Sequence, residues 1–347
     1  MQTAQTMQTV ERLVQGTADP RDPLLPVVST RVEIVDPVPE EALVRATEGE
    51  VVDVPVRMRW WIERVDSEHR EATDVVTLRR DVHGWTRLSP ARLPWGLTDP
   101  MAQTSPRCRI VGSDQEAALV QAVHESCERA VGAVSDVWPG WREAAVVVLS
   151  PGAFDSGTAA RVEGSVRPGS PASADRVVMS AAAAATLAPE GLDIVLRHEL
   201  VHIAMRATGA GPVPLWLEEG LAVHVGYTGV ADDRSEQPAE LRRLHARRAG
   251  GGWPGAVPDE TAFTDPSSRE DAYVAARVAV EVMMTAVGRE RLLRTAADAS
   301  GRAGPRPTTD AQRTEWFLTA LGRSPDWLER EWGRELDRRV SALSTSR

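Results

Sequence analysis

The residues in this sequence that are most able to do chemistry lie in one short run, His198-Glu199-Leu200-Val201-His202. Positions four apart share one face of an α-helix, so His198 and His202 can present imidazole nitrogens to a single metal ion. Glu199 then lies beside that ion, where a carboxylate can accept a proton from metal-bound water. The spacing predicts a zinc site with its own base. A pattern with three fixed positions also arises by chance, so the prediction depends on a third ligand.

A candidate third ligand is Glu219, which lies 17 residues after His202 in the run Trp216-Leu217-Glu218-Glu219-Gly220. The surrounding segment, Pro214 to Val225, is itself a good helix that follows a Gly-Pro turn. A hairpin of two helices can return Glu219 over the two histidines. Three protein ligands leave the fourth tetrahedral position to water, which is the arrangement of catalytic zinc sites.

Together, the two segments resemble the gluzincins, a clan of zinc metallopeptidases in the peptidase MA superfamily that includes thermolysin and the membrane alanyl aminopeptidases. In those proteins the glutamate directly before the glycine of a Trp-Leu-x-Glu-Gly run is the third ligand. The resemblance therefore implies that Glu219 binds the single Zn²⁺ ion and that Glu218 holds the variable position. It also implies hydrolysis of peptide bonds, in which Glu199 takes a proton from bound water and passes it to the leaving amine.

The tetrahedral intermediate of such a reaction needs a hydrogen-bond donor for its oxyanion. The chain has only two tyrosines, Tyr227 and Tyr273. Several gluzincins carry a transition-state-stabilising tyrosine at the start of a helix downstream of the third ligand, and the resemblance implies this role for Tyr273. The alternative is a ring that packs at the helix start while its hydroxyl stays solvated. We expect Arg277 to be solvated or salt-bridged rather than to bind a substrate carboxylate, and His224 to lie outside the set of metal ligands.

The helix that must position the two histidines is predicted from about residue 189 to 208, with Pro189 at its start and Gly209 just past its end. Apolar residues surround its axis, so we expect it to be buried. Two histidines and a carboxylate are costly inside a protein unless their polar atoms are satisfied. A metal ion would satisfy all three side chains together.

The remaining elements predict an α+β fold, with strands first and helices after. Alternating apolar residues predict a strand over 52–62 and a hairpin over 75–88, in a small antiparallel sheet that weakly resembles nuclear-transport-factor-like (SnoaL-like) domains. Further strands are predicted at 108–111, 144–149 and 176–180, around a helix at 114–137. From residue 189 onward the chain reads as helical, with loops at 209–213, 228–237, 249–269 and 300–309.

These elements suggest three parts: a polar N-terminal segment over 1–26, a β-rich domain over 27–100, and a zincin-like metallopeptidase domain over 107–347. The boundary between the last two is placed in a proline-rich stretch. The 176–180 strand resembles the sheet edge that pairs with an extended substrate in zincins. The alternative is an ordinary core strand.

The composition of the chain limits the classes of binding partner and the cellular compartment that we expect. The net charge of −10 argues against a general nucleic-acid binder. All 40 basic residues are Arg, and Lys and Asn are absent, which is typical of a GC-rich coding genome such as that of an actinobacterium. The chain as given has neither an export signal nor an apolar run long enough for a membrane segment, so the prediction is a cytoplasmic protein. Cys108 and Cys127 are expected to be reduced and buried, with one disulfide as the alternative.

The leading hypothesis from the sequence is a zinc-dependent peptidase that acts on a peptide or protein substrate. An endopeptidase is favoured, because the Gly-x-Met-x-Asn signature with which alanyl aminopeptidases grip a free N-terminus cannot occur in a chain without Asn. The second hypothesis is a non-catalytic zinc-binding or interaction protein that retains the gluzincin fold. Glu199 favours the first hypothesis, because a purely structural zinc site has no use for a base.

Overall fold

The computed structural model describes residues 2–15, 28–34, 43, 45–62, 70–89, 100–138, 140–141, 143–151, 154, 158–165, 173–207, 213–229, 238–253, 255, 257–299 and 309–345. The chain forms two compact units. The first comprises residues 1–124, 144–164 and 173–186, and the second comprises residues 125–143, 165–172 and 187–347.

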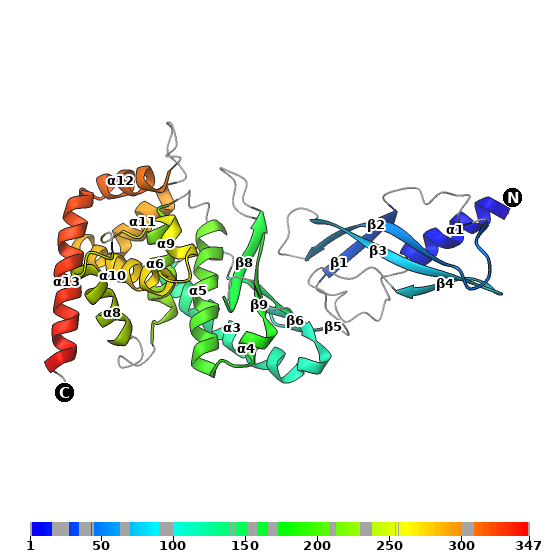
Figure 1. Cartoon of the computed structure of the whole chain (residues 1–347), viewed down its shortest axis with the longest axis horizontal. Helices are drawn as coiled ribbons and strands as arrows, with labels where there is room; N and C mark the ends of the chain where they lie inside the picture. The colour runs from blue at the N-terminus through cyan, green and yellow to red at the C-terminus, as the bar shows by residue number, and fades with distance from the viewer. Residues whose placement is uncertain are drawn as a thin grey trace. The chain divides into compact units, whose positions relative to one another are not determined.

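The first unit contains a four-stranded antiparallel sheet in the order β1-β2-β3-β4 (Figure 1). Its elements are β1 (Val28–Ile34), β2 (Val51–Ile62), β3 (Arg70–Asp81) and β4 (Gly84–Ser89). The strand predicted over 52–62 and the hairpin predicted over 75–88 are both confirmed. The hairpin turn is held by Asp81, whose carboxylate accepts a hydrogen bond from the backbone N–H of His83 at 2.9 Å.

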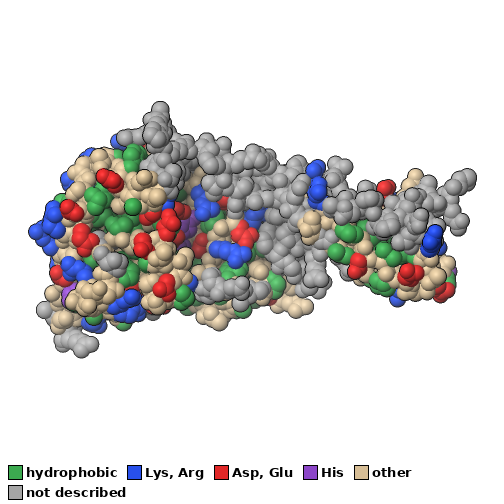
Figure 2. All heavy atoms as spheres, turned by 45° about the horizontal axis from the view of Figure 1, so that its top comes forward, with side chains coloured by type: hydrophobic (Ala, Val, Ile, Leu, Met, Phe, Trp, Pro, Cys, Tyr) green, Lys and Arg blue, Asp and Glu red, His purple; other side chains and the backbone are tan. Residues whose placement is uncertain are grey.

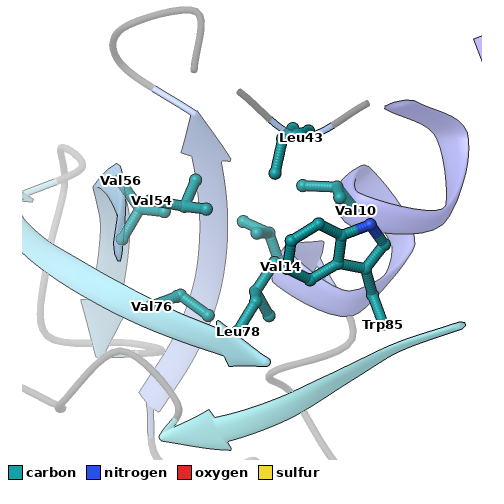
Figure 3. Close-up of a cluster of buried hydrophobic side chains, with 8 residues drawn as sticks. All are labelled: Val10, Val14, Leu43, Val54, Val56, Val76, Leu78 and Trp85. Atoms are coloured by element: carbon teal, nitrogen blue, oxygen red, sulfur yellow. The ribbon is translucent and has the colours of Figure 1, made fainter. Parts of the chain in front are cut away.

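The core of this sheet is completed by an N-terminal helix, α1 (Gln2–Gln15). Alternate residues of β2 and β3 face inward because successive side chains of a strand point to opposite faces. They pack with Val10 and Val14 of α1, and both of these valines are fully buried. Figure 3 shows the cluster, which consists of Val10, Val14, Leu43, Val54, Val56, Val76, Leu78 and Trp85. The N-terminal segment, expected to be polar and to form a short helix or a loose tail, therefore forms a helix that supplies apolar core to the sheet.

A second, mixed sheet has the strand order β5-β6-β7-β9-β8. Its strands are β5 (Pro100–Thr104), β6 (Cys108–Ser113), β7 (Ala145–Ser150), β8 (Ala160–Ser165) and β9 (Ser173–Ser180). β5 and β6 pair antiparallel, whereas β6 with β7 and β7 with β9 pair parallel. All residues of β7 except the last are buried, as its continuous apolar run predicts.

The position of β9 corrects one expectation. The 176–180 segment lies between β7 and β8, so it is an interior strand and not a sheet edge. β8 occupies the side on which an extended substrate would have to pair. The sequence could not show this, because β8 is a short strand between glycine- and serine-rich stretches.

The helices are η2 (Asp114–Glu116), α3 (Ala117–Val137), α4 (Ala181–Ala184), α5 (Pro189–Ala207), α6 (Leu215–Gly226), α8 (Pro238–Ala249), α9 (Glu260–Thr264), α10 (Arg269–Val287), α11 (Arg289–Asp298), α12 (Asp310–Ala320) and α13 (Pro325–Thr345). One of them, α9, falls within the loop predicted at 249–269. The side chain of Asp259 caps it by accepting from the backbone N–H of Ala262, and Phe263 anchors it in the interior. An antiparallel sheet, a mixed sheet and a helical C-terminal part make the chain α+β.

Both cysteines of the chain, Cys108 and Cys127, are disulfide-bonded. The expectation of two reduced thiols was therefore wrong. It rested on the apparent lack of an export signal, which carries no information about where two sulfur atoms lie in a fold. The predicted cytoplasmic location stays a prediction, and a disulfide is unusual in that compartment.

The surface of the helical part mixes charges of both signs, as Figure 2 shows for one face. On α13, Arg334 pairs with Glu331 and Arg338 pairs with Glu335 one turn apart. Pairs such as these, in which the arginine is exposed, contribute little to stability. Within the described residues, none of the helices combines the length and apolarity needed to cross a membrane. The domain boundaries predicted at residues 26, 100 and 107 stay predictions.

Candidate metal centre

The helix that carries both histidines, α5, is buried and held at its first turns by a polar cluster. Leu196, Leu200 and Ile203 are fully buried. Asp193 accepts hydrogen bonds from Ser126 and from Arg129, whose Nη2 lies 2.8 Å from the Asp193 Oδ1 atom. This cluster links α3 to α5 one turn before His198. The buried apolar helix predicted from the sequence is confirmed.

The next helix, α6, approaches both of its neighbours at glycines. A Cβ atom at Gly220 would lie 2.5 Å from the carbonyl oxygen of Ala276 on α10, closer than real Cβ contacts allow. At Gly226, a Cβ atom would lie 3.1 Å from the carbonyl oxygen of Ile194 on α5. The absence of a side chain at these two positions lets α6 pack between α5 and α10. Glu219, directly before Gly220, is placed by this packing.

The start of α6 is fixed by α12. The backbone N–H of Leu215 donates to Asp310 Oδ1 at 2.8 Å, and the indole N–H of the fully buried Trp216 donates to Thr314 Oγ1 at 3.1 Å. A buried tryptophan needs such an acceptor for its N–H group. The tryptophan of the 216–220 run therefore has a structural role, because it docks the helix that carries Glu219.

Three potential ligand atoms converge between α5 and α6. His198 Nε2 lies 3.3 Å from His202 Nε2 and 3.3 Å from Glu219 Oε2, and His202 Nε2 lies 3.5 Å from Glu219 Oε2. Two atoms that each lie about 2.0–2.1 Å from a tetrahedral zinc ion are about 3.3–3.4 Å apart. The three side chains predicted as ligands thus form a group that could hold a metal ion, and it is the one such group found among the described residues.

Glu219 Oε2 is a buried atom of this group that makes no hydrogen bond of good geometry with the described residues, although the Nε2 atoms of His198 and His202 lie 3.3 and 3.5 Å from it. A cation bound between these three atoms would satisfy the carboxylate oxygen. The donor set of two imidazole nitrogens and one carboxylate oxygen suits zinc and related divalent ions.

The carboxylates and the His202 imidazole of this group shift one another's pKa values. Burial alone would lower the pKa of His202, but the carboxylates of Glu219 and Glu218 outweigh it and raise that pKa well above its usual value. Burial would raise the pKa of Glu219, but the imidazoles of His202 and His198 hold that pKa well below its usual value. The carboxylates of this group therefore favour a positive charge on His202.

The two residues predicted to act on the substrate also lie at this site. Glu199 is 8% exposed, and its carboxylate has no hydrogen bond to any other described residue. The ring of Tyr273, near the start of α10, contacts that of His198 edge-on, with 5.9 Å between centroids. The Tyr273 ring also meets Phe263 of α9 at 5.5 Å. Burial, and then the carboxylates of Glu219 and Glu199, raise the pKa of Tyr273, so its hydroxyl keeps its proton.

His224 and Arg277 instead contact the carboxylate of Glu281. His224 Nδ1 and Arg277 Nε each lie 3.0 Å from Glu281 Oε1, and Arg339 of α13 lies 2.7 Å from Glu281 Oε2. Burial would raise the pKa of Glu281, but its partners outweigh it and lower that pKa to about 2. The salt-bridged Arg277 expected from the sequence is confirmed. The Glu281 cluster joins α6, α10 and α13.

Two residues that form contacts in this part of the fold were not singled out by sequence reasoning. Glu218, assigned only to a variable position, lies with Oε1 2.9 Å from His202 Nδ1. Glu281 lies far along the chain within an apolar helix. The signal for Glu218 was present, since it is a second acidic residue beside the predicted ligand. No local signal existed for Glu281 beyond its being a charge among apolar neighbours.

No known family model matches the chain, and no curated protein matches it. The interpretation of this centre therefore depends on its own geometry and on the chemistry of its side chains.

We expect Gly220→Ala to destabilise the protein by about 1–3 kcal/mol, because the new methyl group has no room beside Ala276 and must push α6 from α10. Metal affinity should fall as well, since Glu219 moves with the helix. Urea unfolding and metal titration measure the two effects. Gly132→Ala is the matched control: nothing lies within 4 Å of its Cβ position in α3, so there the same change should stabilise by about 0.4–1 kcal/mol. Equal effects of the two substitutions would contradict the close approach.

Glu281→Gln should cost about 3 kcal/mol at pH 7, because it removes the carboxylate charge that pairs with His224, Arg277 and Arg339. The pKa of Glu281 is about 2 in the folded protein and 4.5 normally, so the charge contributes its full stabilisation above about pH 4.5. The contribution is lost as pH falls toward 2, and the two proteins should converge there. Chemical unfolding between pH 7 and 3 measures this. The exposed Glu290→Gln should change stability by less than about 0.5 kcal/mol, and a pH-independent difference for Glu281→Gln would refute the assignment.

Proposed function

We propose that the protein is a zinc-dependent peptidase of the gluzincin type, most consistent with an endopeptidase. The observation that carries the proposal is the spacing of His198 Nε2, His202 Nε2 and Glu219 Oε2, each within 3.3–3.5 Å of the other two. This is the spacing of three ligands on a tetrahedral zinc ion. A fourth position is then left for water or substrate.

When bound, zinc would supply a water molecule of lowered pKa and would polarise the scissile carbonyl group. Glu199 is the residue to accept the proton of that water, since it follows His198 directly and its carboxylate has no other described partner. It can then return the proton to the leaving amine. Tyr273, whose hydroxyl stays protonated beside His198, can donate a hydrogen bond to the oxyanion.

The second candidate is a non-catalytic zinc-binding protein that retains the same helices. Glu199 argues against it, because a base serves no purpose at a structural zinc site. The number of protein donors argues against it too, since structural zinc sites use four and the described residues here offer three.

Glu199→Gln separates these candidates. The substitution keeps the shape of the side chain and removes the base, so peptide turnover should fall by a factor of about 10²–10⁴ while zinc content stays at one ion per chain. The measurements are metal content by mass spectrometry and cleavage of a mixed peptide library. Glu190→Gln, at an exposed position on the same helix, should leave both unchanged. Stoichiometric zinc without Glu199-dependent cleavage would favour the non-catalytic protein, and a protein that binds no metal would exclude both candidates.

For Tyr273→Phe, we expect kcat to fall by a factor of about 10²–10³ with little change in KM, because an oxyanion donor acts mainly in the transition state. Steady-state kinetics on a cleaved library peptide gives both constants. Tyr227→Phe is the matched control, since the ring of Tyr227 lies under Arg277, 5.2 Å from the guanidinium carbon, and should leave kcat unchanged. An unaltered kcat for Tyr273→Phe would remove this residue from the catalytic machinery.

A further inference from the structure

Two adjacent glutamates of α6 contact the two nitrogens of one imidazole. Glu219 Oε2 lies 3.5 Å from His202 Nε2, on the side where the ligand atoms converge. Glu218 Oε1 lies 2.9 Å from His202 Nδ1, the other ring nitrogen. The distance to Glu218 is that of a hydrogen bond between charged or polar groups. His202 is therefore held between a ligand candidate and a second carboxylate.

The contact with Glu218 determines where the ring carries hydrogen. An ionised carboxylate can only accept hydrogen bonds, so Nδ1 of His202 must be the donor. The lone pair of the neutral ring then lies on Nε2, the atom that faces His198 and Glu219. A carboxylate acceptor also makes the imidazole a stronger electron donor to a metal ion.

This support is specific to one of the two histidines. The described residues provide no carboxylate partner for the Nδ1 atom of His198, whose ring instead contacts Tyr273. His202 is also the more buried of the two, with its side chain 8% exposed against 19% for His198. A buried ring whose orientation is fixed at both nitrogens is the more rigid part of the site.

Glu218 also takes no part in the contacts that dock α6 on its neighbouring helices. The helix is docked by Trp216 on α12 and by Gly220 on α10. The Glu218 side chain is 24% exposed, and its carboxylate bonds to His202 rather than to either docking helix. A change at Glu218 should therefore act on His202 and leave the docking of the helix intact.

We infer that Glu218 is a positioning residue of the metal centre: it holds His202 in the tautomer whose Nε2 binds the metal and raises the donor strength of that nitrogen. The inference rests on the proposed metal site, and it extends that site to a residue outside the ligand set. The metal affinity of the protein should then depend on Glu218 although Glu218 does not touch the metal.

The test measures Zn²⁺ affinity of the full-length metal-free protein by competition with a chromogenic chelator. Glu218→Ala removes the acceptor and should weaken Zn²⁺ binding by a factor of about 10–100. Glu218→Gln keeps a neutral acceptor and should bind Zn²⁺ more weakly than the wild type but more tightly than Glu218→Ala. Glu190→Ala removes the same charge from an exposed position on α5 and should bind Zn²⁺ as the wild type does.

Each other outcome has a definite meaning. Wild-type affinity in both Glu218 variants overturns the inference, and so does a Glu218→Gln affinity no better than that of Glu218→Ala, because the hydrogen bond would then be irrelevant. If Glu218→Ala does not fold, Glu218→Gln decides alone: weaker binding supports the inference and unchanged binding overturns it. Stoichiometric zinc without peptidase activity in the wild type defeats the proposed function and leaves this test standing. Failure of the wild type to bind Zn²⁺ overturns both.

Discussion

The close approach of two helix backbones is the constraint on which the metal centre depends. At Gly220, α6 comes so near α10 that a Cβ atom would meet the Ala276 carbonyl oxygen at 2.5 Å. Glu219 is the residue before this contact, and Tyr273 lies one helical turn before Ala276 on the other helix. This one contact between α6 and α10 therefore determines the positions of both the candidate ligand and the candidate oxyanion donor. A second glycine, Gly226, lets the same helix approach α5, which carries both histidines.

Around this packing, the carboxylates of Asp193, Glu281 and Asp271 each pair with a residue on another helix. Asp193 joins α5 to α3, and Glu281 joins α6, α10 and α13. At the start of α10, Asp271 is 2% exposed and pairs with Arg243 and Arg247 of α8 at 2.7 and 2.6 Å. Breaking such pairs by removing one member is far more costly than breaking surface pairs. These ion pairs and hydrogen bonds fix the positions of the helices around the site. Glu219 Oε2 differs from these groups, because it lies between the imidazole nitrogens of His198 and His202 without a hydrogen bond of good geometry.

Periodicity along the chain was a reliable guide wherever an element is long. The strand alternation of 52–62, the hairpin after it and the buried helix from Pro189 were all predicted, because side-chain burial repeats with the geometry of the backbone. Three of the failures have one cause. The interior place of β9, the docking of α1 on a sheet and the pairing of Cys108 with Cys127 each depend on a partner segment distant in the sequence. α9 was missed because five residues are too few to show a period.

The sequence by itself determined which side chains of the candidate centre can share a helix face. Four-residue spacing places His198 beside His202 in any α-helix, and Glu199 beside them, without reference to the rest of the chain. Only the tertiary structure decided how the two adjacent glutamates divide their roles, with Glu219 toward Nε2 and Glu218 toward Nδ1 of His202. It also decided that Tyr273, and not Tyr227, lies against His198. The physical reason is that these contacts cross between helices, so they depend on interhelical distances, which packing at glycines and buried ion pairs controls.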